Sequence, residues 1–230
     1  KAPEGVGEEK YDVTAVSMMV ILRYGTGFPL NRLDVLQESL EIPLPASTQW
    51  DVASRNVGTF QPVFLWLVRQ AAQGQILYND DTTMKILELM KTGRERLQLE
   101  ENPDRKGVFT SGIVSERDGI RIALFFTGPK HAGENLATVL AEREAGLQPP
   151  IQMCDALARN VPKEFETILS NCMSHARRQY VDVVADFPGE CRFVLETLAE
   201  VFKNDATART QGLAPQERLE LHRRESLPVM

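Results

Sequence analysis

The chain has 230 residues, 43% of them hydrophobic and 25% charged, as is typical of a soluble globular protein with a sizeable core. No apolar run is long enough to span a membrane, and the N-terminus lacks the basic start and apolar centre of a signal peptide. The formal net charge of −6 argues against a general nucleic-acid binder but leaves room for local basic patches. Three cysteines, which cannot all pair and show no close zinc spacing, indicate a reducing, cytoplasmic setting.

The first 72 residues are predicted to be helical. The segment TAVSMMVILRYG carries its apolar residues on one helical stripe, and NRLDVLQESLEI is amphipathic with Asn31 as its N-cap. A third helix is predicted to begin with Ser47 or Thr48 as its cap, and FQPVFLWLVRQAAQG supplies a strongly apolar fourth. Short helices joined by tight turns suit a helix-turn-helix-like module, and they suit a plain helical bundle equally well.

The middle of the chain changes to the period of β-strands. QILYND is predicted to be a strand, followed by a charged helix-and-loop stretch at 84–106 and a hairpin that turns at Glu116–Gly119. An amphipathic helix (HAGENLATVLAERE), a short buried strand in PPIQMCDALARN that ends on Asp155, one more strand (EFETILSNC) and the helical SHARRQYVDVV follow. This order predicts an α/β fold with a mixed sheet flanked by helices.

Two of the predicted strands end on an acid. Asp80 follows the apolar run of QILYND, and Asp155 follows PPIQMC. Sites in open α/β sheets form at the carboxyl ends of the strands, so these two carboxylates converge if their strands are neighbours. Like charges that lie so close favour a cation between them, and carboxylate oxygens suit Mg²⁺ or Mn²⁺. The alternative is that each acid only caps the turn that follows its strand.

Several motifs together resemble the IS66 family of insertion-sequence transposases. The resemblance extends over nearly the whole chain and is carried by the segments ILYNDDTTMKILEL, FTSGIV, IALFFTGPKHAGENLATVLAER, PPIQMCDALARN, NCMSHARRQYVDVV and GLAPQERLELHRRES, together with much of the N-terminal helical region. The resemblance implies a DDE-type enzyme with an RNase H-like catalytic core. It places the first catalytic aspartate on Asp80, with Asp81 in the position of the following glutamate, and the second on Asp155. Side chains alternate along an extended chain, so we expect Asp81 to point away from Asp80 and to be its neighbour, not a ligand. The MSHARR stretch at 173–178 matches a further family motif.

The same resemblance implies what the chain would do. A DDE transposase hydrolyses a phosphodiester at the transposon end, and the freed 3′-hydroxyl then attacks target DNA. Two Mg²⁺ or Mn²⁺ ions held by Asp80, Asp155 and a third acid would support both steps. We expect DNA as the partner, a homo-oligomer in the synaptic complex, action in the bacterial cytoplasm at the nucleoid, and no membrane.

The third acid is the open point of this interpretation. Family members carry it in an Asn-Asn-x-x-Glu-Arg motif, and no Asn-Asn pair occurs here. We therefore expect a central fragment that lacks an N-terminal zinc ribbon and a C-terminal part, and that is inactive alone. A rival prediction places the third acid at Asp205 or Glu200. The expected organisation is a helical region at 1–72, the catalytic core at 73–172 and a helical insertion at 173–230.

Arg177 and Arg178, together with Lys163 and Arg159, form the best local basic patch in the sequence. They are predicted to meet DNA phosphates, although arginines on a helix surface near acids are equally common. A function of another class is also compatible with the sequence: a non-catalytic DNA-binding or assembly module derived from such a transposase. The acidic balance and the missing third acid both permit it.

Overall fold

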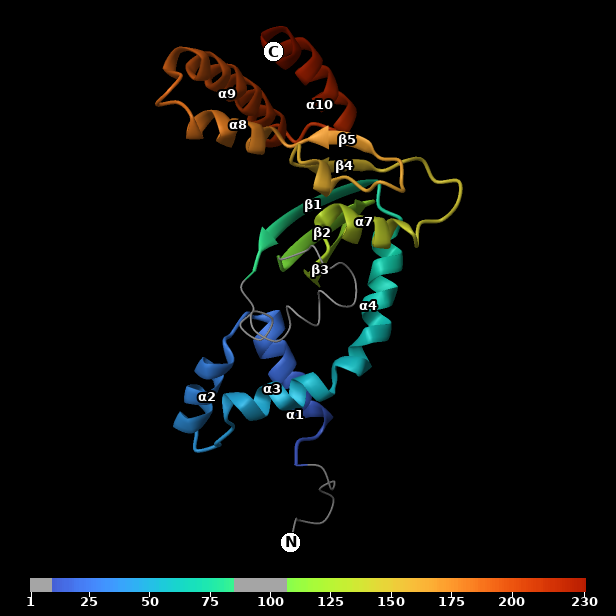
Figure 1. Cartoon of the computed structure of the whole chain (residues 1–230), viewed down its shortest axis with the longest axis vertical. Helices are drawn as coiled ribbons and strands as arrows, with labels where there is room; N and C mark the ends of the chain where they lie inside the picture. Colours follow the sequence, from blue (N-terminus) through green and yellow to red (C-terminus); the bar gives the residue numbers. More distant parts are fainter. Residues whose placement is uncertain (1–9, 85–106) are drawn as a thin grey trace. The chain divides into compact units, whose positions relative to one another are not determined.

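The alternating apolar residues in the middle of the chain form a five-stranded mixed sheet, shown in the computed structural model of Figure 1. The structure describes residues 10–84 and 107–230, so all but the first residue of the predicted 84–106 segment lies outside the described residues. The strand order is β3-β2-β1-β4-β5. The strands are β1 (Ile76–Thr83), β2 (Phe109–Arg117), β3 (Ile120–Gly128), β4 (Ile151–Cys154) and β5 (Ile168–Asn171). The predicted α/β class, a mixed sheet flanked by helices, is confirmed and is consistent with an RNase H-like fold.

The predicted hairpin is confirmed as β2 and β3. It turns at Asp118 and Gly119, whose φ angles are 51° and 78°. Two consecutive positive φ angles match the right-handed twist of the strands, and an Asp-Gly pair adopts them at little cost. β1 pairs with β2 in antiparallel orientation along its full length, from Ile76↔Glu116 to Thr83↔Phe109.

The other half of the sheet is parallel. β1 pairs with β4 from Ile76↔Ile151 to Tyr78↔Met153, and β4 pairs with β5 from Ile151↔Ile168 to Cys154↔Asn171. The chain between β4 and β5 contains only the short 3₁₀ helix η2 (Ala158–Asn160). The central strand β1 therefore has an antiparallel neighbour on one side and a parallel neighbour on the other.

Helix α7 (Ala132–Leu140) packs against β1, β2 and η2. Along the strands, alternate side chains point to one face, and the buried ones include apolar Leu77 and Ile113. Leu136 and Val139 of α7 are completely buried as well. The core also contains polar side chains: Asn79, Ser111, Ser115, Asn135 and Gln152.

The N-terminal helices confirm the prediction that this region is helical. They are α1 (Val13–Val20), the π-helical turn η1 (Ile21–Gly25), α2 (Leu30–Ser39), α3 (Ala46–Arg55) and α4 (Val57–Ala72), of which α4 contains Pro62. The described residues up to Leu67 form one compact unit and those from Val68 onward form a second, with the division inside α4.

Two of the predicted caps are wrong. Helix α2 begins at Leu30 with Pro29 as its N-cap instead of Asn31, and α3 begins at Ala46 with Pro45 as its N-cap instead of Ser47 or Thr48. Both prolines have φ near −60° and an extended ψ, a conformation that suits the residue before a helix. Asp34 of α2 accepts a hydrogen bond from the Ala46 amide at 3.3 Å, so the start of α3 is capped from the neighbouring helix.

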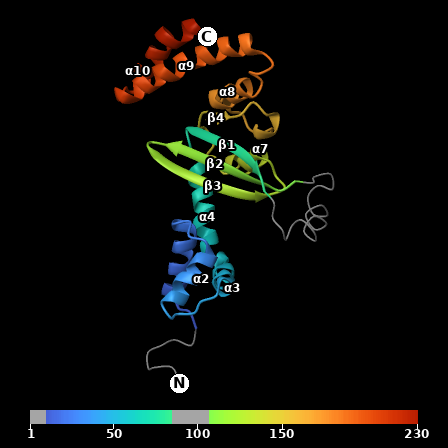
Figure 2. The ribbon, with the colours of Figure 1, turned by 90° about the vertical axis from the view of Figure 1, so that its left-hand side faces the viewer.

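The residues after the sheet are helical, as predicted. Helix α8 (Met173–Asp182) follows β5 directly, and α9 (Pro188–Thr210), α10 (Pro215–Leu221), η3 (His222–Ser226) and η4 (Leu227–Val229) complete the chain (Figure 2). α9 packs against α8, α10 and η3. Across the described ranges, no helix combines the length and the apolar character that crossing a membrane would require.

Gly133 provides a test of the packing of α7. A Cβ at this position would lie 2.6 Å from the Arg159 carbonyl oxygen and 2.7 Å from that of Val161. We expect Gly133→Ala to lower the free energy of unfolding by about 1–3 kcal/mol, because backbone on both sides would have to move. Urea unfolding followed by circular dichroism measures the change.

Gly189→Ala is the matched control for that variant. Gly189 also lies in the first turn of a helix, but a Cβ there would have no neighbour within 4 Å. We expect its stability to be unchanged or raised by up to about 1 kcal/mol. Equal losses in both variants would contradict the close approach of α7 to residues 159–161.

Candidate active site

Asp80 lies inside β1 and not at its end. The sequence predicted that the strand would stop at this residue, but β1 continues to Thr83. The reason is the second neighbour of the strand, since β2 pairs with β1 as far as Thr83↔Phe109. On the side of β4, the pairing stops at Tyr78↔Met153, two residues before Asp80. Asp80 therefore lies beyond the end of the parallel ladder while its other edge remains paired.

The sequence predicted that the strand before Asp155 would end on this acid, but β4 ends one residue earlier at Cys154, and Asp155 follows it. Each observed β1–β4 pair joins residues 75 apart in number: 76 with 151, 77 with 152, and 78 with 153. Continuing this register places Asp155 level with Asp80. Residues that pair in a parallel ladder point to the same face of the sheet. Asp80 and Asp155 lie two residues beyond the last observed pair, and the extended register would present their carboxylates at the same level and on the same face.

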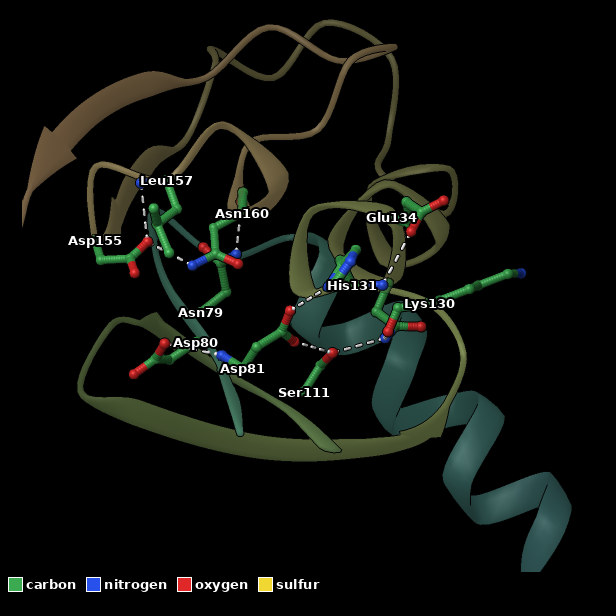
Figure 3. Close-up of polar contacts among 11 residues, drawn as sticks. Asn79, Asp80, Asp81, Ser111, Lys130, His131, Glu134, Asp155, Leu157 and Asn160 are labelled. Atoms are coloured by element: carbon green, nitrogen blue, oxygen red, sulfur yellow. Dashed lines mark hydrogen bonds and ion pairs between the residues drawn. The ribbon is translucent and has the colours of Figure 1, made fainter. Parts of the chain in front are cut away.

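Two hydrogen bonds fix the Asp155 carboxylate. Its Oδ1 accepts from the Leu157 amide at 3.1 Å and from Asn160 Nδ2 at 2.5 Å (Figure 3). Asp155 therefore does cap the turn that follows its strand, as the alternative interpretation of this acid predicted. These contacts also hold the carboxylate in one orientation, which a ligand site requires.

A buried layer of amides lies behind the two acids. Gln152 Nε2 donates to Asn79 Oδ1 and to the Asn160 carbonyl oxygen, both at 2.8 Å, while Asn79 Nδ2 donates to the same carbonyl at 2.7 Å. Thr167 donates to Gln152 Oε1 at 2.8 Å. The layer connects β1, β4 and η2, so the loop that positions Asp155 is attached to the strand that carries Asp80.

The neighbouring acid Asp81 points the opposite way. The side chain of Asp80 is 57% exposed, whereas that of Asp81 is 2% exposed. Asp81 accepts hydrogen bonds from Ser111 Oγ at 2.7 Å and pairs with His131 Nδ1 at 3.0 Å (Figure 3). Alternation along the strand predicted these opposite orientations. Of these two adjacent acids, only Asp80 is accessible to a ligand from solvent.

His175 lies beside Asp80, which the sequence did not establish. It belongs to the first turn of α8, and its Nε2 is 3.6 Å from Asp80 Oδ2. The buried Nδ1 has no hydrogen-bond partner among the described residues. Asp80 and His175 line a cavity of about 320 Å³ together with Cys154 and Cys172. The sequence signal for His175 was the MSHARR stretch at 173–178, which contains it.

The negative charge of this site affects the pKa of the Cys154 thiol. Burial raises its pKa, and the negative charges of Asp155 and Asp80, followed by the neighbouring Cys172, raise it further. Both carboxylates therefore act on one thiol, in agreement with their placement at the same end of the β1–β4 ladder.

Arg177 and Arg178 lie on α8 and are exposed. The first turn of the same helix carries His175, which lies beside Asp80. The structure records no direct contact between either arginine and the two aspartates. Their predicted role toward DNA is not tested by this geometry.

No group of three or more His, Cys, Asp or Glu side chains suitable for a metal ion occurs within residues 10–84 and 107–230. Asp205, one of the two rival third acids, binds Arg218, and it also pairs with Arg209 Nε at 3.3 Å and with His222 Nε2 at 3.4 Å. Glu200 is paired with Lys203 on the surface of α9. The described structure does not bring either acid into a three-acid cluster with Asp80 and Asp155.

The donor atoms at Asp80 and Asp155 fit a hard divalent cation. Both offer carboxylate oxygens, which Mg²⁺ and Mn²⁺ prefer, and such ions bind through one or two carboxylates while keeping several waters. The exposed Asp80 leaves room for those waters. The pair is therefore a candidate metal-binding position.

The chain is similar to a known protein family over nearly its whole length. The model of the family described as "Transposase IS66 family" matches residues 10–230. The chain belongs to the IS66 family of transposases. The resemblance inferred from the sequence motifs is thereby confirmed. Searches of curated proteins and of solved structures gave no significant match.

Asp205 offers a test of its structural role in this IS66 family member. Burial acts to raise its pKa, but hydrogen bonds from Arg218 and His222 and the charge of Arg209 outweigh burial and hold the pKa below the usual 3.8. A carboxyl group with a lowered pKa contributes stability above its unfolded pKa and loses it as the pH falls toward the folded pKa. We therefore expect the thermal stability of the wild type to fall below about pH 4 more steeply than that of Asp205→Asn.

Thermal unfolding followed by circular dichroism across this pH range measures the difference. Glu200→Gln, which removes an exposed acid from the same helix, is the control and should keep the wild-type profile. Identical profiles for Asp205→Asn and the wild type would show that the basic side chains around Asp205 do not stabilise the C-terminal helices through its charge.

Proposed function

We propose that the chain contributes the metal-dependent core of a DDE-type transposase, with Asp80 and Asp155 as two of its catalytic and metal-binding acids. The observation that carries the proposal is the β1–β4 register, which sets these two carboxylates level on neighbouring parallel strands. Membership of the IS66 family supports the transposase activity in general. The finer reaction would be phosphodiester hydrolysis at the ends of an insertion sequence, followed by strand transfer.

Asp80 and Asp155 would hold Mg²⁺ or Mn²⁺. Two such ions, when bound, activate the attacking oxygen and stabilise the leaving oxygen of a phosphodiester. The remaining parts of the site position the acids: Asn160 and the Leu157 amide orient Asp155, and the amide layer of Asn79 and Gln152 links the two strands. Hydrolysis would free a 3′-hydroxyl at the transposon end, which then attacks a phosphodiester of target DNA.

A third acid would complete the site from outside the described residues. The support for this is that Asp205 is surrounded by Arg209, Arg218 and His222, while Glu200 lies exposed on α9. We propose that the 230-residue chain binds metal weakly and does not cleave DNA alone. In this view residues 73–172 are the catalytic core, 1–72 a helical region that precedes it, and 173–230 a helical insertion.

The partner would be DNA, with Arg177 and Arg178 on α8 meeting its phosphates near the acids. Transposon ends and target would be held in a homo-oligomeric complex in the cytoplasm. The second candidate function, a non-catalytic DNA-binding or assembly module, is favoured by the missing three-acid cluster in residues 10–84 and 107–230. The two candidates differ in whether Asp80 and Asp155 bind a metal ion.

Titration with Mn²⁺ separates the two functions. We expect the chain to bind Mn²⁺, and Asp80→Asn and Asp155→Asn to weaken binding by more than about 100-fold, because each removes a direct ligand. Electron paramagnetic resonance of the free ion measures the affinity. Asp118→Asn, at the exposed hairpin turn, is the control and should bind as the wild type does.

Absence of Mn²⁺ binding by the wild type, or equal binding by all four proteins, would contradict the catalytic proposal and support the module. Circular dichroism of each variant shows whether it folds. If only Asp155→Asn fails to fold, its loss of binding reflects the lost turn contacts of Asp155. The Mn²⁺ affinity of Asp80→Asn then decides between the two functions.

The two arginines on α8 generate a separate prediction. We expect Arg177→Ala and Arg178→Ala each to weaken binding of double-stranded DNA of any sequence, and to reduce the slope of log K against log salt by about 1. Fluorescence anisotropy at several salt concentrations gives the slope. Arg192→Ala is the control, because Arg192 is an exposed arginine already paired with Glu196 at 2.7 Å. The same slope for all three variants and the wild type would contradict a phosphate contact.

A further inference from the structure

We propose that Asp81, Ser111 and His131 form a positioning network that fixes β1 at Asp80 and orients its carboxylate. These three residues are called the Asp81 network below. The inference deepens the proposed function and rests on it, because it concerns the acid that would bind metal. Nothing in the family match assigns a role to this network.

The burial of Asp81 is the first observation. A carboxylate with 2% exposure is strongly unfavourable inside a protein unless other groups satisfy it. Both of its oxygens are engaged: Oδ1 accepts from Ser111 Oγ at 2.7 Å, and Oδ2 lies 3.0 Å from His131 Nδ1. Ser111 belongs to β2 and His131 caps α7, so one side chain of β1 is attached to two other elements.

The partners of Asp81 are themselves held in place. Asn135 Nδ2 donates to Ser111 Oγ at 2.8 Å, and the His131 ring contacts the Phe109 ring with centroids 4.3 Å apart. The His131 amide donates to Glu134 Oε2 at 2.9 Å. A hydrogen-bond network whose members are all satisfied and packed makes a rigid attachment point.

The network reaches Asp80 through the backbone. The amide of Asp81 donates to Asp80 Oδ1 at 2.8 Å, so the position of Asp81 sets the orientation of the Asp80 carboxylate (Figure 3). This support is needed because Asp80 lies beyond the last β1–β4 pair and is held by backbone pairing only on the side of β2. Asp81, Ser111 and His131 are thus positioning residues, and none of them would touch the metal.

Four variants test the Asp81 network. Ser111→Ala and His131→Ala each remove one partner of Asp81, and His131→Asn retains an amide donor near the position of Nδ1. Ser115→Ala is the matched control: Ser115 is a buried serine of the same strand whose Oγ donates to the Ala71 carbonyl oxygen at 2.7 Å, outside the network. Ser115→Ala loses one buried hydrogen bond of β2, whereas Ser111→Ala loses the bond to Asp81 and also the one that Ser111 Oγ accepts from Asn135 Nδ2.

Hydrogen–deuterium exchange of the metal-free protein gives the first readout. We expect amides of residues 79–83 to exchange about tenfold faster in Ser111→Ala and His131→Ala, and at the wild-type rate in Ser115→Ala. Mn²⁺ affinity gives the second readout. It should fall about tenfold in Ser111→Ala and His131→Ala, stay within about threefold of wild type in His131→Asn, and be unchanged in Ser115→Ala.

Wild-type exchange at residues 79–83 in Ser111→Ala and His131→Ala would overturn the inference. So would equal losses of Mn²⁺ affinity in Ser111→Ala and Ser115→Ala, because a general loss of stability would then explain both. If the wild type binds no Mn²⁺, the proposed function fails, and the exchange rates alone decide whether the Asp81 network fixes β1. If His131→Ala does not fold, the comparison of Ser111→Ala with Ser115→Ala decides whether the Asp81 network fixes β1.

Discussion

The parallel pairing of β1 with β4 is the constraint on which the candidate site depends. Three residue pairs define its register, and that register alone sets Asp80 level with an acid 75 positions later in the chain. Parallel strands need a long crossover, and here the β2–β3 hairpin and α7 lie within it. The hairpin adds a full-length partner to β1, and α7 covers the buried face. The long connection therefore stabilises the strand on which the site is built.

The two faces of β1 place two adjacent carboxylates in different surroundings. Asp80 faces solvent beside His175, and Asp81 faces the core beside His131. An exposed carboxylate retains the hydration and the free oxygens that a cation needs, whereas a buried one is satisfied by donors from the protein. The chemistry available to each acid follows from its position in the alternation and not from its residue type.

The sequence predicted what depends on local pattern. The hairpin follows from Asp118 and Gly119, the strand that precedes Asp155 from its apolar run, and the opposite orientations of Asp80 and Asp81 from alternation. The family motifs located both candidate acids.

The features that the sequence did not predict depend on partners distant in the chain. β1 continues past Asp80 because β2 pairs with its far end, and the cap of α3 comes from Asp34 of another helix. His131 meets Asp81 across 50 positions, and His175 meets Asp80 across 95. No periodicity within one segment contains such contacts, since they arise only when the sheet and the helices are assembled.

The polar residues buried beneath the sheet also define how β1 can pair. A shift of β1 by one residue would exchange the faces of its side chains, turning Asp80 toward Ser111 and His131 and exposing Asp81 together with Asn79. An apolar residue at either buried position would tolerate that error more readily, because hydrophobic contacts have little directionality. Hydrogen bonds from Ser111, His131 and Gln152 are directional, so they form only when β1 pairs in the observed register. The strand is thus specified by its polar contacts to a single register, the one in which Asp80 is the acid that meets solvent.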